Sequence, residues 1–177
     1  MTDAKEYGKA LFLITEEDGT TERVLSEVTL VEKLLSSNPE YTKLLDTPAL
    51  VKEERVRLID ESFGSFDTSL CNLIKILCER REVHLLPKVC ESYSKEYDTS
   101  RGIERVDVIT AIPLTDSQAE RLKERLGALT GKTVIINNIV EPSTLGGVKL
   151  RYSGIQLDGS IKTRLQKFEE ALCKTVI

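Results

Sequence analysis

The spacing of hydrophobic positions along the chain changes once, near residue 103. Before that point, apolar residues recur at intervals of three and four, as in the runs Tyr7–Ile14 and Val24–Leu35. This spacing is typical of amphipathic helices. Further helices are predicted over about 39–45, 52–63, 68–77 and 86–97. Six helices joined by short loops indicate a helical bundle.

Local signals mark where several of these helices begin and end. Asn38 precedes Pro39 as an N-cap residue precedes a proline in the first helical turn. Asp67 is placed to cap the fifth helix, and Gly64 is expected to end the fourth. Pro87 is compatible with either the start of the sixth helix or a kink in it, and the sequence leaves both open.

After residue 103 the period of the apolar positions becomes two, which is typical of strands. In the first predicted strand, Val106, Val108 and Ile112 share one face. Thr115 and Gln118 form the pattern of a capping box. The helix that follows is expected to turn four residues inward: Ala119, Leu122, Leu126 and Leu129.

Three more strands and a terminal amphipathic helix complete this second region. The strands are predicted over 132–140, 148–152 and 155–157, and the helix begins near Ile161. The fold class is therefore α+β overall. An N-terminal six-helix bundle is expected over residues 1–104 and a small α/β domain over 105–177.

Net charge divides at the same place. Residues 1–104 hold 14 Lys+Arg against 21 Asp+Glu, whereas residues 105–177 hold 11 against 8, and the whole chain carries −4. An acidic chain is a poor candidate for nucleic-acid binding. The opposite signs suggest two partners rather than one cleft, although a chance difference between solvated surfaces explains them equally well.

Neither a membrane segment nor a catalytic site is predicted. The longest apolar run, Ala10–Ile14, is far too short to span a bilayer, and acidic residues interrupt any N-terminal signal sequence. The four cysteines form no CxxC pair and His84 is the only histidine, so neither a metal site nor a histidine-based triad is expected. Gly146-Gly147 leads into a strand and not into a helix, which argues against a phosphate loop. We therefore expect no cofactor and no direct membrane insertion.

Several motifs occur in an order that is shared with a known family. Tyr7-Gly8-Lys9-Ala10-Leu11-Phe12 is similar to an opening Tyr-Ala-x-Ala-Leu-Phe, with Gly8 in place of an alanine that would favour the helix more. The most specific pair is Pro142–Val148, which contains Gly146-Gly147, followed by the run from Asp158-Gly159-Ser160 to Leu165. With these motifs, the chain resembles over nearly its whole length the delta subunits of bacterial rotary ATP synthases. In mitochondria this family is called the oligomycin-sensitivity-conferring protein.

The resemblance implies a function that periodicity does not supply. It implies a non-catalytic stator subunit of F-type ATP synthase, which links the catalytic head to the peripheral stalk in proton- or sodium-driven ATP synthesis. The implied partners are the N-terminal helix of an alpha subunit, held between the first and fifth helices, and the C-terminal ends of the b subunits. The implied location is the cytoplasmic face of the bacterial cell membrane, as a peripheral part of the complex.

Both helices of the implied groove are apolar on more than one face. Candidates for contact with the alpha subunit are Tyr7, Leu11, Ile14, Leu70, Ile74 and Leu77. Spacing alone does not separate a groove from central helices that are buried all round, so which of these residues face the partner stays open. Ile74→Asp serves as an example of a surface-facing change.

Basic residues in the C-terminal region are candidates for contact with the b subunits. They are Arg151, Lys162, Arg164 and Lys167. A helical adaptor of another multi-subunit assembly is the alternative, against which the Gly-Gly and Asp-Gly-Ser pair argues. An unrecognised enzyme is a third interpretation.

Overall fold

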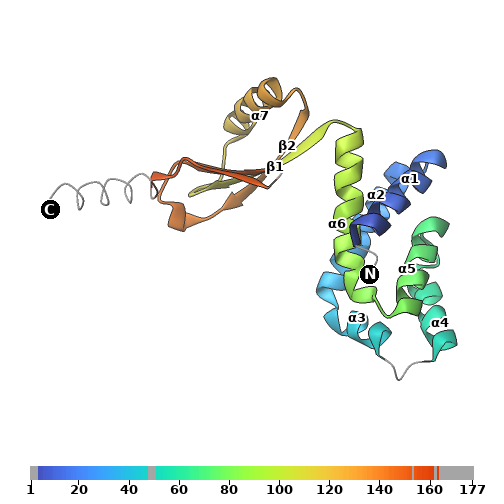
Figure 1. The fold of residues 1–177 in the computed structure, drawn as a ribbon. Helices are drawn as coiled ribbons and strands as arrows, with labels where there is room; N and C mark the ends of the chain where they lie inside the picture. Colours follow the sequence, from blue (N-terminus) through green and yellow to red (C-terminus); the bar gives the residue numbers. More distant parts are fainter. Residues whose placement is uncertain (1–3, 48–50, 153, 162, 164–177) are drawn as a thin grey trace, which may run out of the picture. The chain divides into compact units, whose positions relative to one another are not determined.

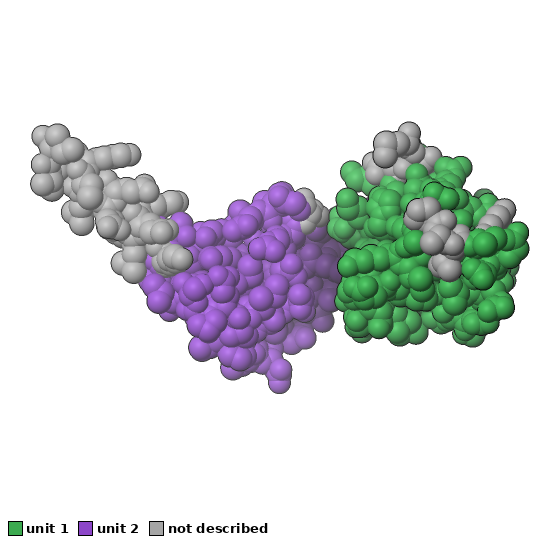
Figure 2. All heavy atoms as spheres, turned by 90° about the horizontal axis from the view of Figure 1, so that it is seen from below, with its two compact units in different colours: residues 1–97 green, residues 98–177 purple. Residues whose placement is uncertain are grey.

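The computed structural model describes residues 4–47, 51–152, 154–161 and 163. The chain divides into two compact parts, which we call unit 1 (residues 1–97) and unit 2 (residues 98–177) (Figure 2). Unit 1 is helical, and unit 2 combines a helix with a four-stranded sheet (Figure 1). The fold is therefore α+β, with a helical N-terminal part and an α/β C-terminal part.

The helical segments lie where the periodicity predicts them. They are α1 (Ala4–Glu17), α2 (Thr21–Ser37), α3 (Pro39–Asp46), α4 (Lys52–Phe63), α5 (Thr68–Arg80) and α6 (Leu86–Ser100), with the short 3-10 turn η1 (Val83–Leu85) before α6. Their starts confirm part of the capping analysis. The Asp67 carboxylate accepts a hydrogen bond from the Ser69 N–H at 2.9 Å. The helix α6 begins at Leu86, so Pro87 lies in its first turn and does not kink it.

Asn38 is the N-cap residue of α3, as predicted, but its side chain does not cap that helix. Asn38 does precede α3, but its side-chain amide donates to the Leu34 carbonyl at 2.9 Å and makes no cap bond. This bond satisfies a carbonyl in the last turn of α2, where helical carbonyls lack partners. Asn38 therefore ends α2 with its side chain and begins α3 with its backbone carbonyl, which accepts the Tyr41 N–H at 3.1 Å.

The core of unit 1 is aliphatic, with Tyr93 of α6 at its centre. The Tyr93 side chain is fully buried, and its hydroxyl lies 2.9 Å from Thr15 Oγ1 and 3.1 Å from the Thr21 carbonyl. Its ring meets Phe12 edge to face at 6.0 Å. Because these contacts join α6 to α1 and α2, one buried polar residue aligns three helices.

The cysteines behave as core residues. Cys71, Cys78 and Cys90 are buried free thiols, and Cys173 lies outside the described residues. Burial raises the pKa of Cys90 to about 12. A thiol with so high a pKa is neutral and unreactive at neutral pH. The interpretation of Cys71 and Cys78 as small core hydrophobes is confirmed.

The described part of unit 2 contains a mixed sheet and the helix α7, which packs against one face of it. Its elements are β1 (Ile103–Thr110), α7 (Asp116–Thr130), β2 (Thr133–Val140), the 3-10 turn η2 (Pro142–Thr144), β3 (Val148–Tyr152) and β4 (Ile155–Asp158). The strand order is β2-β1-β3-β4, with β1 and β2 parallel and the other neighbours antiparallel. The predicted capping box at Thr115 and Gln118 opens α7. The helix thus forms the crossover that a parallel strand pair requires.

The core of unit 2 is small. Val106, Val108 and Val134 are buried, and Leu122 and Leu126 of α7 pack against them. Two residues that the periodicity places inward are exposed: Ile112 to 74% and Leu129 to 83%.

Both errors have a physical reason. The strand β1 ends at Thr110, whose hydroxyl donates to the Ile112 carbonyl at 2.7 Å, so Ile112 lies in a turn where strand alternation no longer applies. Leu129 lies in the last turn of α7. The apolar spacing of a helix can continue into its last turn, although the sheet beneath that helix no longer covers the side chains there.

Candidate functional site

The seam between α1 and α5 is the first candidate surface. These helices pack together, and an Arg80 guanidinium N–H donates to the Tyr7 hydroxyl at 2.9 Å. Because Tyr7 lies near the start of α1 and Arg80 at the end of α5, the two helices run antiparallel. Ile14 lies two turns along α1 from Tyr7, and Ile76 lies one turn before Arg80, so both border this seam.

Large apolar side chains are half exposed along the seam. Ile14 is 48% and Ile76 45% exposed. Leu13, also on α1, is 49% exposed. Exposed isoleucines on neighbouring helices mark a surface that a partner can cover.

The structure places most of the predicted groove residues in the core. Leu11, Leu70, Ile74 and Leu77 are buried in unit 1, whereas Tyr7 is partly buried and Ile14 exposed. The choice of Ile74 as a surface-facing position is therefore wrong, because its side chain has no exposed area. A charge there would enter the core and not a groove.

Ile76 was missing from the predicted set, although a signal for it was present. It lies two residues from Ile74 and therefore about 200° around the helix. In α5, the buried positions Leu70, Ile74 and Leu77 follow helical spacing and Ile76 stands outside it. An apolar residue outside the core stripe is the pattern that indicates a second contact face.

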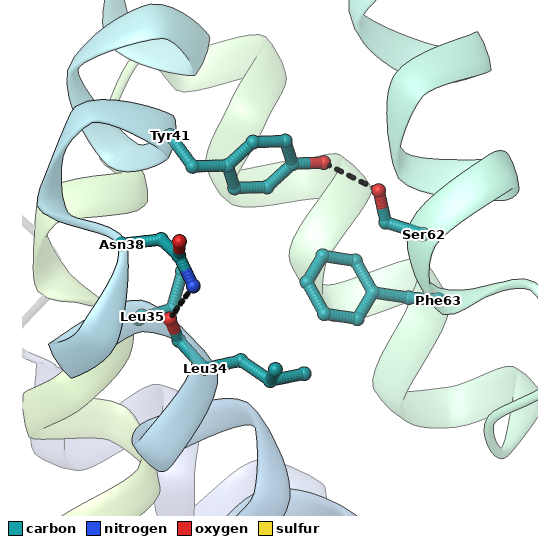
Figure 3. Close-up of a pocket in the computed structure, with 6 residues that line it drawn as sticks. All are labelled: Leu34, Leu35, Asn38, Tyr41, Ser62 and Phe63. Carbon is teal, nitrogen blue, oxygen red and sulfur yellow. Dashed lines mark hydrogen bonds between the residues drawn. The ribbon is translucent and has the colours of Figure 1, made fainter.

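A hollow between α2, α3 and α4 is the second candidate surface (Figure 3). It encloses about 220 Å³ and is lined by Leu34, Leu35, Asn38, Tyr41, Ser62 and Phe63. The Tyr41 hydroxyl and Ser62 Oγ lie 2.9 Å apart and satisfy each other (Figure 3). The walls are otherwise mainly apolar, so the hollow offers shape and not acid–base chemistry.

The face of the sheet that points away from α7 is the third candidate surface. Leu150 packs with the residues under α7, so its neighbour Arg151 points to the opposite face. Arg151 is exposed and lies across from Asp107 on one side and Gln156 on the other. The other predicted basic residues, Lys162, Arg164 and Lys167, lie outside the described residues.

The two halves of the C-terminal motif pair meet in space. The Gly159 N–H donates to the Val148 carbonyl and the Ile161 N–H to the Gly146 carbonyl, both at 3.0 Å. Gly147 has φ +79°, and a side chain there would lie 2.6 Å from the Gly159 carbonyl oxygen. Only glycine satisfies both the left-handed backbone and this close approach. The glycines therefore join two loops and do not form a ligand loop.

Asp158 orders the turn that follows β4. Its carboxylate accepts hydrogen bonds from the Ser160 N–H and the Thr163 hydroxyl, each at 2.9 Å. Hydrogen bonds from Ser160 lower the pKa of Asp158 to about 2. The carboxylate is thus ionised and committed to local structure, which makes it a poor general acid or base at neutral pH.

The chemistry of the described residues is structural. His84 Nδ1 lies 3.0 Å from an Asp46 carboxylate oxygen, and the other oxygen of Asp46 accepts the Val83 N–H, so this pair fastens η1 to the end of α3. Across the described ranges, no group of three or more His, Cys, Asp or Glu side chains is arranged to hold a metal ion. None of the helices in the described part of the chain combines the length and hydropathy that a bilayer crossing requires.

Comparisons with known proteins agree on one family. The sequence model described as ATP synthase delta (OSCP) subunit matches residues 4–172. ATP synthase subunit delta of Geotalea uraniireducens is 32% identical over 173 residues, which is 97% of this chain and 96% of the relative. That of Acetivibrio thermocellus is 34% identical over 168 residues, 94% of each chain.

The fold has a solved counterpart as well. A chain in a Toxoplasma gondii mitochondrial ATP synthase hexamer matches with a TM-score of 0.77 over 98% of both chains, at 20% identity. At that identity the likeness shows the fold alone, whereas the family rests on the sequence matches. The chain belongs to the ATP synthase delta (OSCP) subunit family.

Proposed function

We propose that this protein is a non-catalytic stator subunit of F-type ATP synthase that links the catalytic head to the peripheral stalk. The observation that carries the proposal is the family match over residues 4–172. The described residues are consistent with it, because they offer apolar and charged surfaces rather than an assembled set of reactive groups. A stator must resist torque, and large non-covalent contacts do this without acids, bases or metals.

The partner of the α1–α5 seam is proposed to be the N-terminal helix of an alpha subunit. An amphipathic helix binds by laying its apolar face into a groove with apolar walls. Ile14 and Ile76 supply exposed apolar area on the two sides of the seam. Tyr7 and Arg80 lie at one end, where their hydrogen bond ties the two walls together.

A charge placed in this seam is expected to abolish most of the binding. Ile76→Asp removes an apolar contact and forces a carboxylate against the bound helix, which should weaken capture of an alpha N-terminal peptide at least about tenfold. The melting temperature should stay near the wild-type value, since the side chain is already 45% exposed. Fluorescence anisotropy with a labelled peptide and thermal unfolding of the full chain measure both.

Leu30→Asp is the matched control for this variant. Leu30 lies on α2, outside the seam, and is 46% exposed, so the same change in charge and apolar area is made elsewhere on unit 1. It should leave peptide binding unchanged. If Leu30→Asp weakens binding and Ile76→Asp does not, the groove lies on another face.

The partner of unit 2 is proposed to be the C-terminal end of the b stalk. Residues 105–177 carry a formal +3, and Arg151 is exposed on the open face of the sheet. Charges at the rim of an interface mainly govern the association rate and the dependence on salt. Binding of the full chain to a b subunit is therefore expected to weaken as ionic strength rises.

Arg151→Ala should reduce this salt dependence, whereas Arg125→Ala, an exposed arginine on α7, should reduce it less. Titrations of a b subunit at low and high salt provide the measurement. An affinity that is the same at both ionic strengths would exclude an electrostatic role for this face.

The remaining assignments follow from the same proposal. Residues 1–104 are proposed to form the N-terminal six-helix bundle and residues 105–177 the C-terminal domain. The subunit is proposed to lie at the cytoplasmic face of the bacterial cell membrane, as a peripheral component of the complex.

A further inference from the structure

The chain contains the dipeptide Asp-Gly twice, in two different structural settings. Asp18-Gly19 lies in the turn between α1 and α2, and Asp158-Gly159 lies at the end of β4. An aspartate that precedes glycine is prone to isomerise, because glycine has no side chain to shield its backbone nitrogen from the neighbouring carboxyl group. In a folded chain, the rate depends on how firmly the surrounding structure holds both groups.

The reaction needs only water. The glycine nitrogen attacks the aspartate Cγ atom, the new N–Cγ bond closes a five-membered succinimide ring, and the carboxyl hydroxyl leaves with the amide proton as water. Water then opens the ring. Addition at Cγ restores aspartate, whereas addition at the backbone carbonyl carbon breaks the original peptide bond and gives isoaspartate, in which the main chain runs through Cβ and Cγ. The water released in the first step is taken up in the second.

Both reacting groups are accessible at Asp18-Gly19. The two residues are exposed, and within the described part of the chain the Asp18 carboxylate has neither a hydrogen bond nor an ion pair. The Gly19 N–H donates to the Glu16 carbonyl at 3.3 Å, beyond the usual range of about 2.7–3.2 Å. A side chain at Gly19 would meet nothing within 4 Å, so the peptide has room to rotate toward the carboxyl group.

Both groups are held in place at Asp158-Gly159. The Gly159 N–H donates to the Val148 carbonyl at 3.0 Å, and the Asp158 carboxylate accepts hydrogen bonds from the Ser160 N–H and the Thr163 hydroxyl. Only the protonated carboxyl group loses its hydroxyl readily as water. The hydrogen bonds that lower the pKa of Asp158 to about 2 keep that form rare. Isomerisation at this site therefore requires the turn to open first.

We propose that Asp18 is a site of spontaneous isoaspartate formation in the folded protein and that Asp158, in the same dipeptide, is protected. The product is an L-isoaspartyl residue. Its free α-carboxylate is the group that isoaspartyl methyltransferases methylate with S-adenosylmethionine, so such an enzyme is the class of partner that this site would recruit.

The modification would lengthen the main chain by one methylene group in the turn that joins α1 to α2. Across this turn the Thr20 N–H and the Thr21 hydroxyl both donate to the Thr15 carbonyl, at 2.9 and 3.2 Å. The Thr15 hydroxyl in turn contacts the buried Tyr93 hydroxyl. Isoaspartate at position 18 is therefore expected to disturb the attachment of α1 to the core of unit 1.

Peptide mapping of the full chain tests the proposal. Trypsin cuts after lysine and arginine, so the two sites fall into separate peptides, residues 10–23 and 152–162. After incubation of the folded chain at neutral pH, electron-based fragmentation in a mass spectrometer should find isoaspartate at position 18. Formation at position 158 should be at least about tenfold slower, because it requires local opening. In guanidinium chloride the two rates should become similar, since the flanking structure is lost.

Two variants provide matched controls. Asp18→Glu keeps the charge in an exposed turn but would need a larger ring, so isoaspartate should disappear from the 10–23 peptide. Thr163→Ala removes one hydrogen bond from the Asp158 carboxylate and should speed isomerisation at position 158. The inference would be overturned by a folded chain that isomerises at position 158 as fast as at position 18. Reaction at position 18 only in denaturant, or isoaspartate in the 10–23 peptide of Asp18→Glu, would contradict it equally.

Discussion

Replacing Ile74 with aspartate is expected to unfold unit 1, whereas the same replacement at Ile76 is expected to leave it folded. Ile74 has no exposed area and lies in the core between α5 and its neighbours. Removing its apolar side chain costs about 1.5–3 kcal/mol. Placing an unpartnered polar group there costs about 2–7 kcal/mol more. Together these terms are comparable with the total stability of a small domain, about 5–15 kcal/mol.

Far-ultraviolet circular dichroism during heating measures this result. The Ile74→Asp chain should lose helical signal at ambient temperature or melt far below the wild type. The Ile76→Asp chain should melt near the wild-type temperature. A conservative variant, Ile74→Val, should lower stability only by about 0.5–1.5 kcal/mol. Wild-type melting of the Ile74→Asp chain would show that Ile74 does not face the core.

Gly8→Ala is expected to destabilise unit 1, although alanine has a higher helix propensity than glycine. A Cβ atom there would lie 2.5 Å from Ser92 Cβ and 2.8 Å from the Tyr93 backbone nitrogen. The helices α1 and α6 would have to separate, which would disturb the Ser92 bond to the Lys5 carbonyl and the contact of Tyr93 with Thr15. Overpacking costs about 1–3 kcal/mol, more than the roughly 1 kcal/mol by which alanine favours a helix over glycine. Gly8→Val should be worse, because a second clash adds to the first.

Gly127→Ala is the matched control, because it changes helix propensity in the same way without a steric clash. Gly127 lies inside α7, and a Cβ atom there would come no closer than 3.4 Å to another group, the Lys132 carbonyl oxygen. This variant should be neutral or stabilising. Ser92→Gly in the Gly8→Ala background should restore part of the lost stability. Thermal unfolding measures the stability of these variants. A Gly8→Ala chain that melts above the wild type would contradict the predicted clash with Ser92.

Local sequence signals predicted the elements well because each depends on neighbouring residues. The Asp67 cap and the Thr115 capping box are interactions within three residues, and both form. The phase of α5 likewise follows from its own spacing, which separates Leu70, Ile74 and Leu77 from Ile76. The same local reasoning fails where an element ends, as at Ile112, which is exposed just beyond β1. The spacing of apolar residues does not show where the neighbouring elements stop covering them.

The candidate surfaces depended on residues that are distant in the sequence. The contact between Tyr7 and Arg80 spans 73 positions and decides which stripes of α1 and α5 share a seam. Strand order, which leaves β2 at an edge, depends on pairing of β1 with β3 and not on the composition of β2. Neither relation has a signature in a single local window.

The sequence by itself determined the α+β class, the helical and strand segments, the aliphatic core and, through its ordered motifs, the family. Only the tertiary structure decided that Ile74 is buried while Ile76 is exposed, and that Gly8 is required where Ser92 packs. The physical reason is the range of the interactions. Helix caps and the hydrogen bonds within one helical turn join neighbouring residues, whereas burial is decided by side chains that folding brings together from distant parts of the chain.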